Sequence, residues 1–185
     1  MSVNRKFSAP AGQTAARRIA WDGMFAALSL ILSYIEFLLP PLLPIPGCKL
    51  GLANIVILWC VLRFGWADGV CVNLCRILLS SLLFGSVSGM LFSLCGGALS
   101  LLFLGLTYRG YPRIFSLFGL SAGSAVCHQA GQLLVTAVLY SPLSALGYSL
   151  WLLAAGIVTG CVNALILLLL TRYLPLGKEQ RHATE

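Results

Sequence analysis

The sequence predicts an all-α integral membrane protein, built as a compact bundle of six transmembrane helices with both termini in the cytoplasm. Hydrophobic residues make up 59% of the 185 residues and charged residues only 9%. The mean hydropathy of +0.93 is far above that of soluble domains. These two observations predict the class, and the distribution of basic residues predicts the orientation.

Breaks in the apolar pattern place the six helices in order. The prolines that begin at Pro40 end the first segment, Gly65 separates the second from the third, and Gly85 separates the third from the fourth. Pro112 precedes the fifth segment and Pro142 the sixth. The expected helices are Ala20–Leu39, Leu50–Phe64, Ala67–Phe84, Val87–Leu106, Arg113–Tyr140 and Leu143–Tyr173.

A spanning helix needs about 20 predominantly apolar residues, and the expected segments meet this length unequally. Leu50–Phe64 is short enough to be re-entrant instead of spanning. Arg113–Tyr140 and Leu143–Tyr173 exceed one span, so they must tilt, kink or extend beyond the lipid.

The domain organisation is one transmembrane domain between two tails. Residues 1–19 form a basic cytoplasmic N-terminal tail, residues 20–174 the six-helix domain, and residues 175–185 a cytoplasmic C-terminal tail. No short apolar core with a small-residue cleavage site follows the first tail, so we expect the first helix to be an uncleaved signal anchor.

Basic residues in short loops mark the cytoplasmic side of a membrane protein. With both termini inside, Lys49 is the one basic residue outside and Arg76 lies within the membrane. The net charge of +7 is then a topology signal spread over several loops, which does not indicate nucleic-acid binding. The basic residues expected inside are Arg5, Lys6, Arg17, Arg18, Arg63, Arg109, Arg113, Arg172, Lys178 and Arg181.

The cysteines do not form a recognisable disulfide or metal pattern. Their number, seven, is odd, and no Cys/His cluster has the spacing of a zinc site. We therefore expect no metal and interpret as small buried hydrophobic residues those inside apolar runs: Cys60, Cys71, Cys75, Cys95, Cys127 and Cys161.

Small residues recur every fourth position on several segments, a spacing that lets helix backbones approach closely. Two interpretations stay open: packing within the bundle, or a docking face for another membrane subunit. The residues singled out for helix packing or partner docking are Gly23, Ala27, Gly85, Gly89, Gly97, Gly123, Gly131, Gly156 and Gly160.

A few polar residues inside apolar segments are the candidates for function. Arg76 is near the middle of an apolar stretch, where a fixed charge costs about 2.5 to 3.5 kcal/mol. We therefore expect Arg76 to have an interaction partner or a functional role. The candidate substrate-binding residues are Glu36, Lys49, Asn54, Asn73, Arg76, His128, Gln129 and Gln132.

Helical spacing places these residues on common faces. Asn73 and Arg76 share a face of the third helix, and His128 and Gln132 share a face of the fifth. Either hydrogen bonds between helices or a polar cavity would satisfy such stripes. Glu36 is placed to pair with Lys49 or Arg76, and the sequence does not choose between them.

The sequence lacks the residue patterns that common enzyme mechanisms need. The chain has five acidic residues, and no two lie within one helical turn, so there is no acid pair to hold Mg²⁺ on a diphosphate. It also has no GxxxxGK[ST] phosphate loop. We expect no catalytic residues and no cofactor.

Four runs of sequence together resemble one bacterial membrane family. The family is called both the Gx transporter family and heptaprenyl diphosphate synthase component I, and the resemblance spans roughly residues 20–174. It is similar in turn to the substrate-binding S components of energy-coupling factor transporters, six-helix proteins that bind vitamins or similar molecules near the outer face. The runs are PGCKLGLANI (46–55), VNLCRILLSSLLFGS (72–86), SLCGGALSLL (93–102) and HQAGQLL (128–134).

The resemblance implies a small-molecule-binding subunit of a transporter, with an outward-facing polar pocket, in the bacterial cytoplasmic (inner) membrane. Its ligand would be vitamin-like, or related to prenyl compounds, quinones or flavins. Its partners would be the lipid bilayer, a transmembrane coupling subunit and ATPases, with no nucleic acid. S components contact the coupling subunit through small residues of helix one, which map here to Gly23 and Ala27.

The alternative function is a non-catalytic membrane accessory. It would serve heptaprenyl diphosphate or quinone metabolism, or the flavin-based extracellular electron transfer systems whose membrane component members of the family resemble. In that case the same polar residues would hold the helices together.

Overall fold

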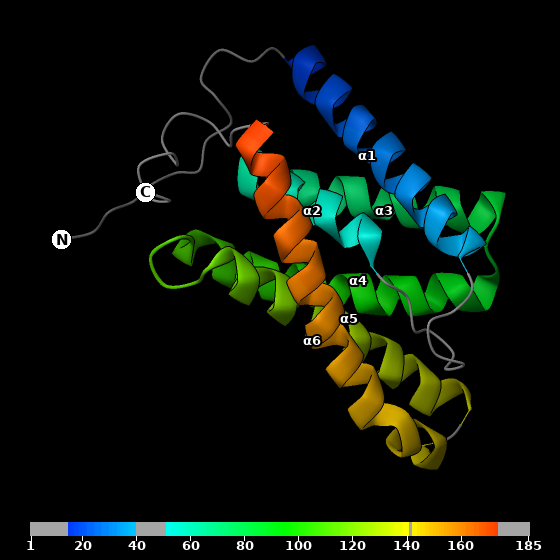
Figure 1. The fold of residues 1–185 in the computed structure, drawn as a ribbon. Helices are drawn as coiled ribbons and strands as arrows, with labels where there is room; N and C mark the ends of the chain where they lie inside the picture. Colours follow the sequence, from blue (N-terminus) through cyan, green and yellow to red (C-terminus); the bar gives the residue numbers. More distant parts are fainter. Residues whose placement is uncertain (1–14, 40–50, 141, 174–185) are drawn as a thin grey trace.

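The computed structural model describes residues 15–39, 51–140 and 142–173, and these residues form six α-helices and one short 3₁₀ turn (Figure 1). The all-α fold class is confirmed within these ranges. The elements are α1 Ala15–Leu38, α2 Leu52–Arg63, α3 Trp66–Leu83, α4 Val87–Thr107, η1 Tyr108–Gly110, α5 Leu117–Leu139 and α6 Pro142–Tyr173.

Two helix starts differ from the prediction. α1 begins at Ala15, inside the segment expected to be tail, and its first turns carry Arg18, which binds Asp68 of α3. α5 begins at Leu117 instead of Arg113 because Ser116 caps it, accepting a hydrogen bond from the backbone N–H of Gly119.

In the part of the chain that the structure describes, four helices are long and apolar enough to cross a membrane: α1, α3, α4 continued to Gly110, and the part of α6 from Ser149 to Thr171. α2 has 12 residues, a length of about 18 Å, which is too short to cross the hydrocarbon layer by itself. α5 has 23 residues but carries buried serine and glutamine side chains along one face.

The short helix α2 lies inside the bundle, where it packs against α1, α3, α5 and α6. Figure 1 shows α2 in cyan between α1 in blue and α6 in orange. Every residue from Ile55 to Leu62 is buried. A helix that is apolar all round suits such an enclosed position, and the enclosure explains why this segment is shorter than a membrane span.

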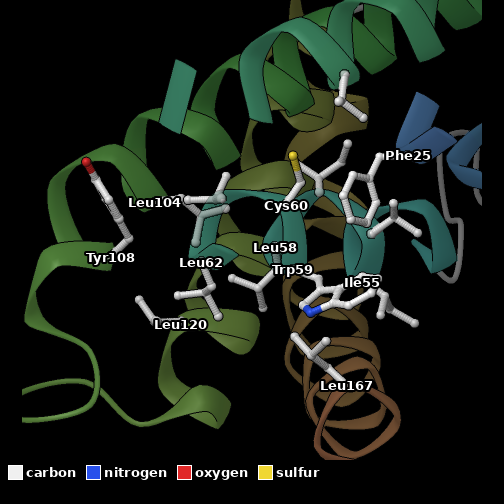
Figure 2. Close-up of a cluster of buried hydrophobic side chains, with 14 of the residues drawn as sticks. Phe25, Ile55, Leu58, Trp59, Cys60, Leu62, Leu104, Tyr108, Leu120 and Leu167 are labelled. Atoms are coloured by element: carbon white, nitrogen blue, oxygen red, sulfur yellow. The ribbon is translucent and has the colours of Figure 1, made fainter. Parts of the chain in front are cut away.

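The main apolar cluster surrounds α2 (Figure 2). Phe25 of α1 is fully buried, and its ring centroid lies 5.0 Å from that of Trp59 and 5.6 Å from that of Phe64. Figure 2 also places Leu104 of α4 and Leu167 of α6 around the same helix. These contacts join the helices around α2 into one body.

Glycines allow the closest helix contacts. A Cβ atom at Gly131 would lie 2.6 Å from the carbonyl oxygen of Cys95, and one at Gly160 would lie 2.5 Å from the Cα of Ala122. Real Cβ atoms do not come this close to a backbone, so only glycine fits. Neighbouring helices also crowd Gly97, Gly123 and Gly156, here mainly through side chains.

Other small residues do not pack between helices. A Cβ atom at Gly85 would meet the backbone of Ser80 and Ser81 near the end of α3, and one at Gly89 would meet only Ser86, which caps α4. Packing between helices is therefore wrong for these two, and partner docking stays a prediction. On α1, a Cβ atom at Gly23 would meet nothing within 4 Å, and Ala27 is exposed.

The cysteines follow the prediction only in part. Cys60 is buried, but Cys71, Cys75 and Cys161 are exposed on the outward faces of α3 and α6. The prediction of burial is wrong for these three, because an apolar segment in a bundle has a face toward the surroundings as well as one toward its neighbours. All six cysteines in the described ranges are free.

Candidate functional site

Arg76 lies inside the bundle, with 8% of its surface exposed. Its Nη2 donates a hydrogen bond to Oδ1 of Asn73 at 2.8 Å, and its Nη1 donates to Oγ of Ser33 on α1 at 3.4 Å. Both acceptors are uncharged, whereas a guanidinium group is charged at every relevant pH. Its hydrogen-bond partners therefore do not neutralise Arg76.

Glu36 of α1 acts electrostatically on Arg76. Across the described ranges, the ion pair within 4.0 Å is that between Arg18 and Asp68, and none includes Arg76. Nε of Arg76 is buried and has no hydrogen-bond partner among these residues. The N–H group at Nε of Arg76 is therefore a donor without an acceptor in the described ranges.

The register of α2 against α3 places Arg76 at the beginning of α2. Gly69 of α3 packs against Val61 of α2, and the two helices run in opposite directions. Arg76 is seven residues after Gly69, and Asn54 is seven residues before Val61. Seven residues are about two turns, or 10 Å, so this register brings the start of α2 to about the level of Arg76.

Gly51, just before α2, joins three helices at this level. Its N–H donates to Oε1 of Glu36 at 2.5 Å, and its carbonyl oxygen accepts a hydrogen bond from Nδ2 of Asn163 on α6 at 3.1 Å. Its φ of 72° lies in the left-handed region, which glycine adopts without strain. Glu36 therefore binds the backbone just before α2 and also acts electrostatically on Arg76.

The polar face of α5 forms a second group. Nε2 of Gln132 lies 3.3 Å from Nε2 of His128, and both Gln129 and Gln132 are buried. Gln129 packs on α6, where its Cγ would be 3.0 Å from a Cβ at Gly156. The Oε1 atoms of the two glutamines are buried without a hydrogen-bond partner in the part of the chain that the structure describes.

Two adjacent glycines of α4 separate these groups. A Cβ at Gly97 would lie 2.6 Å from Nδ2 of Asn73, and a Cβ at Gly96 would lie 2.9 Å from Cε1 of His128. The side chains of Asn73 and His128 therefore pack against two adjacent glycines of α4. These contacts place the two groups at neighbouring positions along α4.

Seven of the eight candidate residues lie in the described ranges, in two groups that each contact α4 or the start of α2, and Lys49 lies outside the described residues. Sequence reasoning missed Ser33 and Asn163. Asn163 carried the same signal as the others, a lone amide in an apolar segment. Ser33 carried none, because serine hydroxyls often bond to their own helix.

Another polar contact lies at the far end of α3 from Arg76. Asp68 is buried in the first turn of α3, and Arg18 binds both of its carboxylate oxygens at 2.7 and 2.8 Å. Arg18 thus has a carboxylate in direct contact, whereas Arg76 is influenced by Glu36 without an ion pair within 4.0 Å in the described ranges.

The fold and the site define an all-α membrane protein with an enclosed cation and several polar side chains at one level of its bundle. The chain belongs to the heptaprenyl diphosphate synthase component I family, whose family model matches residues 25–170. No curated protein and no solved structure matches the chain. The match confirms this part of the resemblance predicted from the sequence.

Proposed function

We propose that this protein is a membrane-embedded binding subunit for a small anionic molecule, similar in role to the S component of an energy-coupling factor transporter, in the bacterial inner membrane. The observation that carries the proposal is the environment of the Arg76 side chain. It is enclosed by the bundle, only neutral side chains accept its hydrogen bonds, and its Nε has no partner in the described ranges.

Enclosing a cation without an ion-pair partner destabilises a fold, and a side chain of this kind at membrane depth marks a functional site by default. An arginine can bind a carboxylate or phosphate through two parallel hydrogen bonds. An anion at Arg76 would supply the missing charge and use its free donors.

The distribution of acidic residues supports a role without catalysis. The whole chain has five acidic residues. Of these, Asp68 lies in the first turn of α3, Asp22 lies two turns into α1, and Glu36 accepts a hydrogen bond from the backbone of Gly51. Chemistry on a prenyl diphosphate needs paired acids to hold Mg²⁺, and the residues around Arg76 offer amides and an imidazole instead.

The test is to identify the small molecules that copurify with the protein. The parent and Arg76→Leu would be purified in parallel, and the compounds released by heat would be compared by mass spectrometry. We expect an anion that is present with the parent and depleted at least about tenfold with Arg76→Leu, since losing a buried charge contact costs about 2 kcal/mol or more. Equal recovery of every compound from both proteins would overturn the proposal.

A second candidate function follows from the family match. The family's name favours a non-catalytic accessory of a heptaprenyl diphosphate synthase, whose partner would be the second component of that enzyme. An accessory for flavin-based electron transfer is a further form of the same hypothesis. Coexpression with a tagged second component separates the candidates, because only the accessory role expects the two to copurify and the synthase activity to depend on this chain.

A further inference from the structure

We infer that Arg76 and the glutamine pair Gln129 and Gln132 line one hydrated site, which admits water-soluble anions and excludes cations. The inference rests on the proposed function and names the class of ligand: an organic anion that also carries N–H or O–H donors. It differs from a prenyl diphosphate, whose hydrocarbon tail has no donors.

The two groups lie at the same level of the bundle. Asn73 and His128 rest on Gly97 and Gly96, which are adjacent in α4. From this common level, Arg76 is three residues further along α3 and Gln132 is four residues further along α5. Because α3 and α5 both run away from the end where Arg18 binds Asp68, these steps of about 5 and 6 Å point the same way.

The two groups have opposite hydrogen-bonding character. Arg76 offers a buried N–H donor without a partner, whereas Gln129 and Gln132 offer buried carbonyl oxygens without a partner, all within the described ranges. The two glutamines are 3% and 2% exposed. A buried acceptor without a hydrogen bond costs about 1 to 3 kcal/mol.

One occupant satisfies both groups. The anionic part of a ligand accepts hydrogen bonds from Arg76, and its N–H or O–H groups, or water, donate to the glutamine oxygens. An apolar chain in the same place would leave both oxygens unpaired. The pattern of unpaired atoms therefore selects a polar anion.

The test uses two small thiol reagents of opposite charge, sulfonatoethyl and trimethylammonioethyl methanethiosulfonate. Gln132→Cys is made in a protein that keeps the buried Cys60 and has its other native cysteines replaced by alanine. Leu134→Cys is the control, because Leu134 is on the same helix but 56% exposed on its outer face. The proteins are held in lipid nanodiscs, so both membrane faces are open to reagent and the result does not depend on topology.

We expect both reagents to leave Leu134→Cys unmodified and the sulfonate to modify Gln132→Cys. Normalised to the rates with free 2-mercaptoethanol, the anionic reagent should react about tenfold faster than the cationic one, because a fixed charge concentrates its counter-ions. Adding Arg76→Leu should bring the ratio close to one. If Gln132→Cys does not fold, Gln129→Cys takes its place.

Two results would overturn the inference. No reaction at either glutamine position would mean a dry bundle, and a charge preference that Arg76→Leu leaves unchanged would mean that Arg76 and the glutamines do not share a site. Failure of the proposed function is visible separately, in the mass spectrometry of copurified anions, because the reagents report on the site without any natural ligand.

Discussion

Arg18 of α1 and Asp68 of α3 form a two-pronged ion pair, with Nε to Oδ1 at 2.7 Å and Nη2 to Oδ2 at 2.8 Å. Asp68 is buried and Arg18 remains partly exposed. The pair fastens the beginnings of two helices that are far apart in the sequence. Here a carboxylate in direct contact neutralises an arginine that joins two helices.

The ion pair should contribute measurably to stability. A double-mutant cycle with Arg18→Met, Asp68→Asn and the double variant isolates the pair from other effects, including the loss of an acidic residue from the first turn of α3. We expect a coupling free energy of about 1 kcal/mol. The bidentate geometry strengthens the pair, and the partial exposure of the Arg18 side chain weakens it. The measurement is thermal unfolding in detergent, and a coupling near zero would contradict the structural role.

Arg76 should behave in the opposite way. Because none of its hydrogen-bond acceptors is charged, we expect Arg76→Leu to keep or raise the unfolding midpoint of the ligand-free protein, since it removes a buried charge and Glu36 keeps its hydrogen bond from Gly51. Arg76→Lys is the matched variant that keeps the charge but loses the fork of donors. A loss of several kcal/mol in Arg76→Leu would assign Arg76 to structural pairing.

The glycines between helices should tolerate no added methyl group. Gly131→Ala and Gly160→Ala each place a Cβ against a neighbouring backbone, so we expect losses of about 1 to 3 kcal/mol in thermal unfolding. Gly89→Ala is the control, because its Cβ would meet only Ser86 and alanine favours a helix. Equal losses at all three positions would show that the close approaches do not decide the effect.

The orientation of the helices in the membrane can be tested by labelling. With both termini in the cytoplasm, the α4–α5 connection is inside and the α3–α4 connection is outside. In a protein whose native cysteines are replaced by alanine, we expect a membrane-impermeant maleimide to label Ser86→Cys in intact cells and to leave Ile114→Cys unlabelled, although Ile114 is 79% exposed. The opposite labelling pattern would invert the topology.

The sequence by itself determined which segments are helices and which residues deserve functional attention. Apart from the starts of α1 and α5, every helix begins and ends within a few residues of the apolar run from which it was predicted. The physical reason is local: a chain in lipid must satisfy its backbone within each segment, and proline and glycine mark where that pattern stops. A charge such as Arg76 inside an apolar run is likewise visible without any structure.

Only the tertiary structure decided which polar groups meet. The contacts of Arg76 with Ser33, of Arg18 with Asp68 and of Gly51 with Asn163 join residues 43, 50 and 112 positions apart. Whether such residues touch depends on the order, rotation and depth of whole helices, to which many side chains contribute. The enclosure of α2 and the end position of Gly85 were fixed in the same way, by the packing of the bundle and not by the segments themselves.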